Sequence, residues 1–360
     1  MLTDIVLISN NYGKSHDGIG SFAFSVFSHF SDYGCKVIVR TAETKQSRSL
    51  KRTLGTAMVS VIRRIAEEIG DKALNPKAVV LEYPFVECNP CIIFQVKKLA
   101  QVCKKNHVPL IVSLHEYSRA NFFRKHIIRE IVKNSDVLCA TTQEILNCIE
   151  NKPAITFLRD VPSNIKNDSP IDLATKDHFE FVFFGLINKA KAFDEMIQGW
   201  EIFFTKKNDP KLKLNIVSAT KLDDDFVEKL AKFNVSYYFN LGEEEISKLL
   251  AKSSFGIVPI VPFIDGKNTT FKTMIDSLVL PIGKFDGTFL KENGFEVAKL
   301  DELLPEQFVF AFGKCYDLAT SRFTDLVNAN KSKAKKFGLD SVSKTYYENL
   351  SEAVSRYERN

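Results

Sequence analysis

The stretch from Phe181 to Trp200 limits the choice of fold more than any other part of the sequence. Four apolar residues, ending at Phe184, follow a charged segment and predict a buried parallel strand. Gly185 then allows a tight turn at the carboxyl end of that strand. Beyond the turn, apolar residues recur with the spacing of one helix face, at Phe193, Met196, Ile197 and Trp200. A strand, a glycine turn and a returning helix predict an α/β fold.

The same alternation runs through the rest of the chain. Apolar runs that predict strands occupy residues 4–9, 35–40, 78–82, 109–114, 213–218, 235–239 and 255–259. Helical patterns separate them, which is typical of doubly wound parallel sheets. A chain of 360 residues is long enough for two such domains.

A segment rich in Pro, Ser and Asn, residues 157–170, predicts the linker between the domains. We therefore expect a first domain over residues 1–160 and a second over residues 171–335. An apolar face that includes Tyr346 and Leu350 predicts a final helix within residues 336–360.

Two lysines, Lys189 and Lys191, lie in the turn after Gly185 and just before the helix. The unpaired amides and the positive dipole end of a helix start favour an anion, so a phosphate is the expected ligand. The alternative is an ordinary strand-to-helix crossover with two solvated lysines.

Three other loops at expected strand ends carry candidate binding residues. Gly18 and Gly20 open a helix after the first strand, where glycine lets a phosphate approach the backbone or only forms a turn. His115 and Glu116 follow the strand at 109–114, where a histidine can equally be structural. A later loop offers hydroxyls, amides and positive charge at a helix start, through Lys267, Asn268, Thr269, Thr270 and Lys272; it can also be a plain polar surface loop.

Composition narrows the class of protein. The apolar share is 45% and no run approaches the length of a membrane span, while the first residues do not have the pattern of a secretory signal, so we expect a cytoplasmic protein. Seven cysteines at irregular positions favour reduced thiols. Cys88 and Cys91 form a single CxxC pair without a further partner, and we assign them no metal or redox chemistry.

Charge is unevenly distributed. Residues 1–160 contain 22 Lys and Arg against 15 Asp and Glu, a net charge of +7, whereas the remainder sums to −2. The basic residues are too scattered for a nucleic-acid-binding stripe, so no nucleic-acid partner is expected. An anionic membrane surface or a lipid-phosphate acceptor fits them better.

Several of these stretches together resemble the glycosyltransferases of the GT-B fold, especially family 4. Gly185 matches the glycine that opens the second domain of that family, and Lys191 matches the lysine that holds the donor diphosphate. His115 followed by an acid, and the loop with Gly18 and Gly20, also match. The resemblance implies two Rossmann-like domains that face a central cleft, with the helix of residues 336–360 crossing back to the first domain.

The resemblance also implies an activity. It is transfer of a sugar from a nucleotide-diphosphate donor to a saccharide or lipid-linked saccharide, with retention and without a metal or other cofactor, in surface polysaccharide or glycoprotein glycan synthesis. His115 and Lys191 are then the expected catalytic residues, and His115 contacts the transferred sugar. The donor is expected to contact Gly18, Gly20, Gly185, Lys191, Lys267, Asn268, Thr269, Thr270 and Lys272, and the acceptor Glu116 and Arg119.

Three positions depart from the pattern of family 4. Leu186 replaces a usual arginine, Ala192 replaces a glycine, and Met274 stands where a glutamate binds the ribose of the nucleotide. These departures keep two alternatives open. One is a GT-B homologue without activity that acts as a binding partner of an active glycosyltransferase. The other is a GT-B sugar-nucleotide epimerase, for which paired catalytic acids are expected. The sequence leaves the donor, the acceptor and the oligomeric state undefined.

Overall fold

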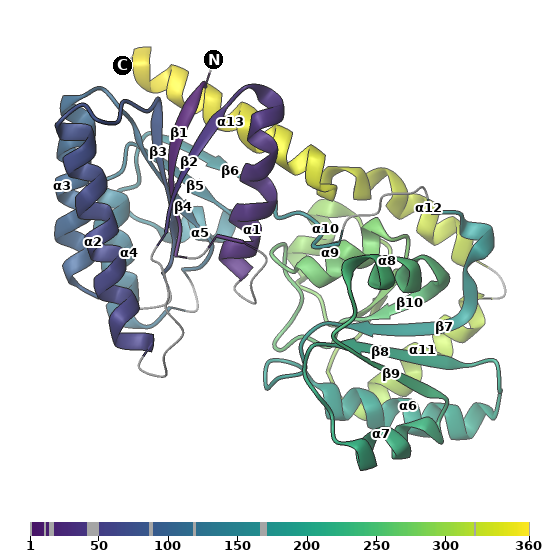
Figure 1. Ribbon diagram of the computed structural model, residues 1–360. Coiled ribbons are helices and arrows are strands. Elements are labelled where there is room, and N and C mark those ends of the chain that lie inside the picture. The colour runs from purple at the N-terminus through teal and green to yellow at the C-terminus, as the bar shows by residue number, and fades with distance from the viewer. Residues whose placement is uncertain are drawn as a thin grey trace. The chain divides into compact units, whose positions relative to one another are not determined.

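The computed structural model divides the chain into two compact units. It describes residues 2–10, 12–13, 18–41, 50–85, 89–117, 120–165, 171–319 and 322–359. The first unit combines Met1–Val161 with Leu339–Asn360, and the second is Pro162–Gly338. Figure 1 shows each unit as a sheet flanked by helices. Among the described residues, no helix is both long enough and apolar enough to cross a membrane.

The first unit is built on a parallel sheet whose six described strands are ordered β2-β1-β3-β4-β5-β6. The central strands are buried over their whole length because helices cover both faces of the sheet. All strands run in the same direction, so their carboxyl ends meet at one edge. The strands are β1 (Asp4–Ile8), β2 (Lys36–Arg40), β3 (Ala78–Tyr83), β4 (Leu110–Leu114), β5 (Val137–Ala140) and β6 (Ile155–Leu158).

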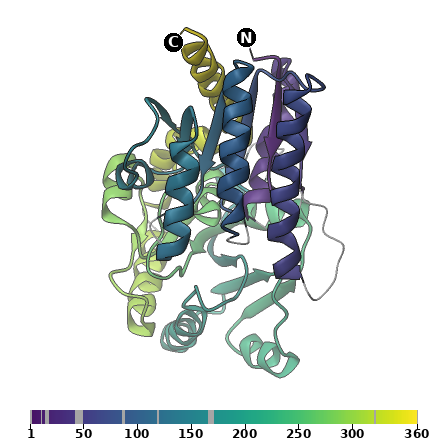
Figure 2. The same cartoon turned by 90° about the vertical axis from the view of Figure 1, so that its left-hand side faces the viewer.

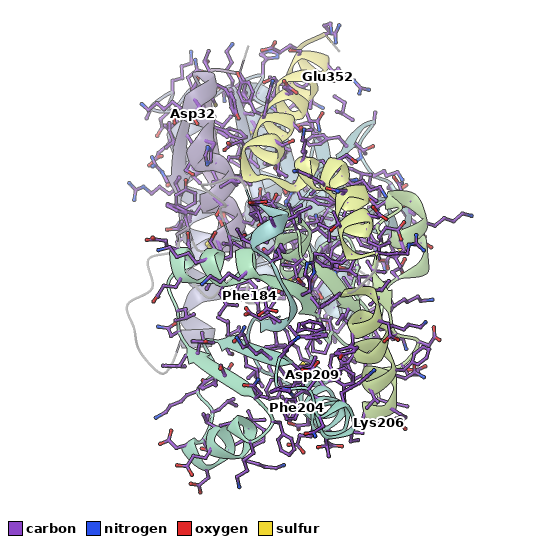
Figure 3. The ribbon with its side chains drawn as sticks, turned by 90° about the vertical axis from the view of Figure 1, so that its right-hand side faces the viewer. Asp32, Phe184, Phe204, Lys206, Asp209 and Glu352 are labelled. Carbon is purple, nitrogen blue, oxygen red and sulfur yellow. The ribbon has the colours of Figure 1, made fainter. Side chains whose placement is uncertain are left out.

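Helices cover this sheet in two layers. On one face lie α2 (Leu50–Gly70), α3 (Cys91–Lys105) and α4 (Phe122–Lys133), which Figure 2 shows side by side. On the other face lie α1 (Gly18–Phe27), η1 (Ser28–Tyr33) and the final helix α13 (Leu339–Arg359). Figure 3 shows α13, with Glu352, beside η1, with Asp32. The short helix α5 (Gln143–Cys148) follows β5.

The second unit repeats the plan with a parallel sheet ordered β12-β11-β10-β7-β8-β9 in the described residues. Its strands are β7 (Asp177–Phe184), β8 (Lys213–Ser218), β9 (Val235–Phe239), β10 (Ser253–Ile257), β11 (Leu280–Gly283) and β12 (Ala298–Lys299). Its helices are η2 (Leu173–Thr175), α6 (Phe193–Lys207), α7 (Asp224–Ala231), α8 (Glu243–Lys252), α9 (Thr269–Asp276), α10 (Gly287–Asn293), α11 (Pro305–Ala319), α12 (Phe323–Ala334) and η3 (Lys335–Phe337).

Aromatic side chains hold α6 against the second sheet. Trp200, which is fully buried, lies 5.2 Å from the ring of Phe181 and 5.4 Å from that of Phe312. Phe181 also stacks on Phe255 of β10 at 4.9 Å. Burial of such large side chains favours folding by about 1.5–3 kcal/mol each, so this cluster fixes the returning helix predicted from the sequence. Phe184, labelled in Figure 3, ends β7.

The predicted α/β fold with two doubly wound, Rossmann-like units is confirmed, and so is the return of the last helix to the first sheet. The expected cleft between the units stays a prediction. One boundary is corrected: the stretch taken for a linker begins inside β6, because Phe157 and Leu158 pair with β5. Residues 166–170 of that stretch lie outside the described residues.

Candidate functional site

The turn between β7 and α6 needs a glycine at position 185. The φ angle of Gly185 is +134°, a region that residues with a Cβ rarely adopt. A Cβ placed on Gly185 would also lie 2.6 Å from Lys191 Nζ and 3.6 Å from Thr270 Oγ1. The side chains of Lys191 and Thr270 therefore border the same small space above the glycine backbone.

Backbone hydrogen bonds tie this turn to the loop after β10. The N–H of Ala192 donates to the carbonyl of Pro259 at 2.8 Å, and the N–H of Val261 donates to the carbonyl of Ala190 at 3.0 Å. Because these bonds flank Lys191 on both sides, they fix where its side chain leaves the backbone. The loop that the sequence predicts to bind the donor and the turn of Lys191 thus form one structural unit.

Lys191 carries a partly buried ammonium group. Burial lowers the pKa of Lys191 from its ordinary value to about 8. The ammonium lies 5.0 Å from the ring centroid of Phe183, and within the described part of the chain no hydrogen-bond acceptor or carboxylate partners it. Most buried charges in proteins are paired, so an unpaired ammonium beside a helix start indicates an anionic ligand.

The start of α9 contributes the other side of this space. The side chain of Asn268 caps the helix by accepting the N–H of Phe271 at 2.7 Å, which leaves the N–H groups of Thr269 and Thr270 directed out of the helix end. Lys267 precedes the cap, and its N–H donates to Asp265 Oδ1 at 2.9 Å. We call the space bordered by Gly185, Lys191 and Thr270, together with the adjoining helix start at Asn268 and Thr269, the lysine site.

Two further residues of α9 are buried. Lys272, expected to contact the donor, is 1% exposed, and its ammonium lies over the ring of Phe337 at 4.6 Å. Its contact with the donor stays a prediction. Met274 is fully buried, and a Cβ on Gly256 would lie 2.5 Å from its sulfur. Met274 is a core residue, so the ribose contact that family 4 makes at this position has no counterpart there.

The first unit has its own polar cluster at the carboxyl edge of its sheet. Nε2 of His115, directly after β4, lies 2.5 Å from Oε2 of Glu82 in β3. Nη2 of Arg159, directly after β6, lies 2.7 Å from His115 Nε2 and 3.3 Å from Glu82 Oε2. Tyr346 of α13 donates its hydroxyl to Glu82 Oε1 at 3.3 Å, and Arg159 Nε donates to Ser113 Oγ at 3.0 Å. We call these five residues the histidine network.

The charges in the histidine network support one another. Burial alone would raise the pKa of Glu82, but the Arg159 guanidinium and His115 outweigh it, so this pKa lies below its ordinary value. Glu82 is fully buried and Arg159 is 4% exposed, whereas the His115 side chain is 13% exposed. Of these three residues, His115 is therefore the one that remains accessible to a substrate. Glu82 and Arg159 fix the orientation of its ring.

Helix α1 packs against His115 through Phe22. Phe22 packs edge-on against the His115 ring at 5.3 Å, and the Arg159 guanidinium lies 3.7 Å over the Phe22 ring. Gly18 begins α1 and Gly20 is buried two residues later, and their contact with the donor stays a prediction. Two buried nitrogen atoms here have no partner among the described residues, Arg159 Nη1 and Asn10 Nδ2.

The residues expected to bind the acceptor are only partly covered by the structure. Glu116 is half-buried next to His115, and Arg119 lies outside the described residues.

In the described part of the chain no cluster of His, Cys, Asp and Glu side chains could hold a metal. A cavity of about 830 Å³ opens at the opposite edge of the first sheet, lined by residues such as Lys77, Lys104 and Asp136, and touches none of these groups.

Sequence reasoning missed four members of the histidine network. Glu82 and Ser113 were assigned only to strands, Arg159 to the linker, and Tyr346 only to an apolar helix face. A signal was present for two of them. A single Glu in an otherwise apolar strand, and an Arg directly after a strand, both place a charge at a sheet edge where it needs a partner.

The architecture and the two candidate sites define a class: the chain has the fold of the GT-B glycosyltransferases. No family model matches the sequence, and no curated protein matches it either. Several solved structures superimpose on almost the whole chain.

Three of these structures illustrate the similarity. A glycosyltransferase from Rickettsia africae ESF-5 has a TM-score of 0.69 at 12% identity, with 98% of this chain and 99% of that chain covered. Sucrose-phosphate synthase from Thermosynechococcus elongatus has a TM-score of 0.65 at 11% identity, covering 98% and 100%. An alpha-glucosyltransferase in complex with UDP-glucose and DNA containing an abasic site has a TM-score of 0.63 at 14% identity, covering 98% and 99%.

Proposed function

We propose that this protein is a glycosyltransferase that moves a sugar from a nucleotide-diphosphate donor to a hydroxyl of a saccharide or lipid-linked saccharide. The observation that carries the proposal is the partly buried, unpaired ammonium of Lys191 beside Gly185 and the start of α9. Structural neighbours with the same fold are complexes with UDP or UDP-glucose, which is consistent with a nucleotide donor.

The lysine site suits the demands of the leaving group. When the bond between the sugar and the diphosphate breaks, negative charge develops on the diphosphate oxygens. The Lys191 ammonium and the N–H groups of Thr269 and Thr270 would stabilise that charge without having to reorganise, because backbone bonds and the Asn268 cap already hold them in place. Gly185 would let the diphosphate approach the backbone closely.

His115 would contact the transferred sugar. Its ring is held between Glu82 and Arg159, and this arrangement fixes its orientation before the substrate arrives. A fixed hydrogen-bonding group costs less entropy when it meets its ligand than a free one does. The proposal includes transfer with retention, in which the leaving group departs from, and the acceptor attacks, the same face of the sugar. It also includes a role in surface polysaccharide or glycoprotein glycan synthesis in the cytoplasm.

The test is a comparison of Lys191→Ala with Lys189→Ala, since Lys189 is an exposed lysine of the same turn. Both proteins and the wild type are first screened with UDP, GDP, ADP and their sugars by thermal shift, because a specific ligand stabilises the fold by mass action. Turnover is then followed as release of the nucleoside diphosphate, with saccharide, lipid-linked saccharide and DNA acceptors. DNA is included because one neighbour is a complex with DNA.

The expected result is specific stabilisation by one nucleotide and turnover that Lys191→Ala abolishes and Lys189→Ala keeps. Equal turnover of wild type and Lys191→Ala would remove Lys191 from the site. Nucleotide binding without release of diphosphate on any acceptor would favour the homologue that binds but does not transfer. Conversion of the nucleotide sugar to its epimer would favour the epimerase.

A further inference from the structure

Two neighbouring helices of the first unit expose large apolar side chains. Phe94 of α3 is 73% exposed, and Phe122 and Phe123 at the start of α4 are 75% and 76% exposed. The rings of Phe122 and Phe123 pack edge-on at 6.0 Å, so they form one apolar projection. Exposed Phe side chains grouped in this way are unusual on a protein surface without a partner.

The same two helices are strongly basic. Together α3 and α4 contain eight Lys and Arg and one acidic residue, Glu130. Lys97 and Lys98 follow Phe94 by three and four positions, and therefore lie on the same exposed face of α3. We call the exposed faces of α3 and α4, with Phe94, Phe122 and Phe123, the α3–α4 surface.

Lys97 and Lys98 of the α3–α4 surface are exposed and have no ion-pair partner among the described residues, unlike two basic residues of the adjacent helix α2. On α2, Arg63 faces Glu67 at 3.9 Å and Arg64 faces Glu68 at 2.9 Å, so these two arginines are paired within the helix. Among the described residues, no carboxylate pairs with the Lys and Arg side chains of α3 and α4. The charges of Lys97 and Lys98 are therefore available to an anionic partner.

The three Phe side chains lie at corresponding ends of their helices. Helix α3 follows β3 and helix α4 follows β4, so both helices begin at the carboxyl edge of the first sheet, and Figure 2 shows them as neighbours in one layer. Arg124 Nη2 donates to the carbonyl of Phe85 at 3.0 Å, which ties the first turn of α4 to the segment that leads into α3. The Phe side chains thus project from a fixed part of the unit.

We propose that the α3–α4 surface docks on a membrane that contains anionic phospholipids. Phe122, Phe123 and Phe94 enter the boundary between headgroups and acyl chains, and the lysines of α3 contact the lipid phosphates. A second copy of this chain is a poor partner, because symmetric pairing would bring two surfaces of like charge together. A nucleic acid is a poor partner because a phosphate backbone offers no apolar surface to three Phe side chains.

Docking is tested with the full-length chain and vesicles, by sedimentation. Vesicles of phosphatidylcholine alone are compared with vesicles that also contain phosphatidylglycerol, at low and at high salt. Binding is expected only to the anionic vesicles and should weaken as salt rises. This readout is independent of the proposed transfer activity, because it needs neither donor nor acceptor.

Two double variants separate the apolar and the charged contributions. Phe122→Ser with Phe123→Ser should weaken binding by at least about tenfold, since partial burial of two Phe side chains is lost. Lys97→Gln with Lys98→Gln should weaken it by about 30-fold at low salt, from about 1 kcal/mol for each basic residue. The matched controls should bind like the wild type: Phe310→Ser, which removes a 59% exposed Phe of α11, and Arg63→Gln with Arg64→Gln on α2.

Four results would overturn the proposal. They are no sedimentation with anionic vesicles at low salt, equal binding to neutral vesicles, unchanged binding of both double variants, and a loss in the controls equal to that in the double variants. Two further measurements decide between partners. A wild-type dimer that Phe122→Ser with Phe123→Ser converts to a monomer would assign the surface to self-association, and a duplex DNA that displaces the vesicles would assign it to nucleic acid.

Discussion

Replacing Gly185 by alanine tests the central feature of the lysine site. The new Cβ would lie 2.6 Å from Lys191 Nζ, but that atom is the end of a flexible side chain and can move away. The backbone cannot relax as easily, because φ at this position is +134°. Gly185→Ala should therefore have two separable effects, strain in the backbone and displacement of the ammonium.

The magnitudes of both effects follow from the geometry. A residue with a Cβ in this backbone region costs about 1–3 kcal/mol, and for a unit the size of Pro162–Gly338 that corresponds to a fall in Tm of roughly 2–12 °C. Loss of a charge-assisted hydrogen bond to a phosphate costs about 1.5–3 kcal/mol, which is a loss in nucleotide affinity of about 10- to 150-fold.

The assay is isothermal calorimetry with the nucleoside diphosphate found by the thermal-shift screen, together with a thermal melt. Gly313→Ala is the control, because a Cβ on Gly313 in α11 meets nothing within 4 Å, and alanine should raise stability by about 1 kcal/mol without a change in affinity. A double-mutant cycle adds a second check. In a Lys191→Ala background, Gly185→Ala should cost less affinity than in the wild type, because the displaced ammonium is already absent and only the close approach to the backbone is lost.

Wild-type nucleotide affinity in Gly185→Ala would refute the reasoning, even if the Tm falls, because the ammonium would then have no part in binding the diphosphate. An equal loss of affinity in the wild-type and Lys191→Ala backgrounds would show that the new Cβ or the backbone strain, and not the displaced lysine, weakens the site.

Three further predictions concern individual ionisable groups. Nucleotide affinity should fall as the pH rises through about 8, the pKa of Lys191, because the neutral amine no longer attracts phosphate; calorimetry on wild type and Lys191→Ala checks this, and an equal pH dependence in both contradicts it. His115→Ala should lower turnover by roughly tenfold or more at unchanged nucleotide affinity, whereas a loss of activity that only follows unfolding would make His115 structural. Glu82→Gln should lower the free energy of unfolding by about 3–5 kcal/mol at pH 7, because it leaves the buried Arg159 without its carboxylate. Because the pKa of Glu82 is lowered in the folded protein, Glu82 stabilises the fold above the ordinary carboxyl pKa, and this stabilisation is lost as the pH falls through the lowered pKa. The free energies of unfolding of wild type and Glu82→Gln, measured by urea melts, should therefore converge in acid. Equal stability of the two proteins at pH 7 would be evidence against the network.

Much of the fold could be predicted because parallel strands buried on both faces produce continuous apolar runs. The strand that ends at Phe184 and the helix with Trp200 are clear from the sequence, and the structure contains both. Strand β6 could not be predicted in the same way. It lies at the sheet edge and is only partly buried, so its four residues, Ile155–Leu158, are too short and too mixed to give a strand pattern.

The parts of the lysine site that depend on local backbone structure could be predicted from the sequence. Gly185, Lys191 and the start of α9 each have a local signature, a turn or a helix start, and the hydrogen bonds after β10 bring them together. Lys272 lies one helical turn after the cap residue Asn268, and the sequence did not show that this face of α9 is buried. The histidine network joins residues far apart in the sequence, and no local pattern predicts such contacts.

The place of α13 in the first unit has a consequence for how the protein is made. The second unit is inserted between Val161 and Leu339, so the first unit is discontinuous along the chain. During synthesis, the strands of the first sheet emerge long before the helix that covers one of its faces, and Glu82 meets Tyr346 only after the whole second unit has been translated. A ribosome that stalls within the second unit would leave the first sheet half covered and the histidine network incomplete, so the nascent chain would expose apolar surface until translation ends.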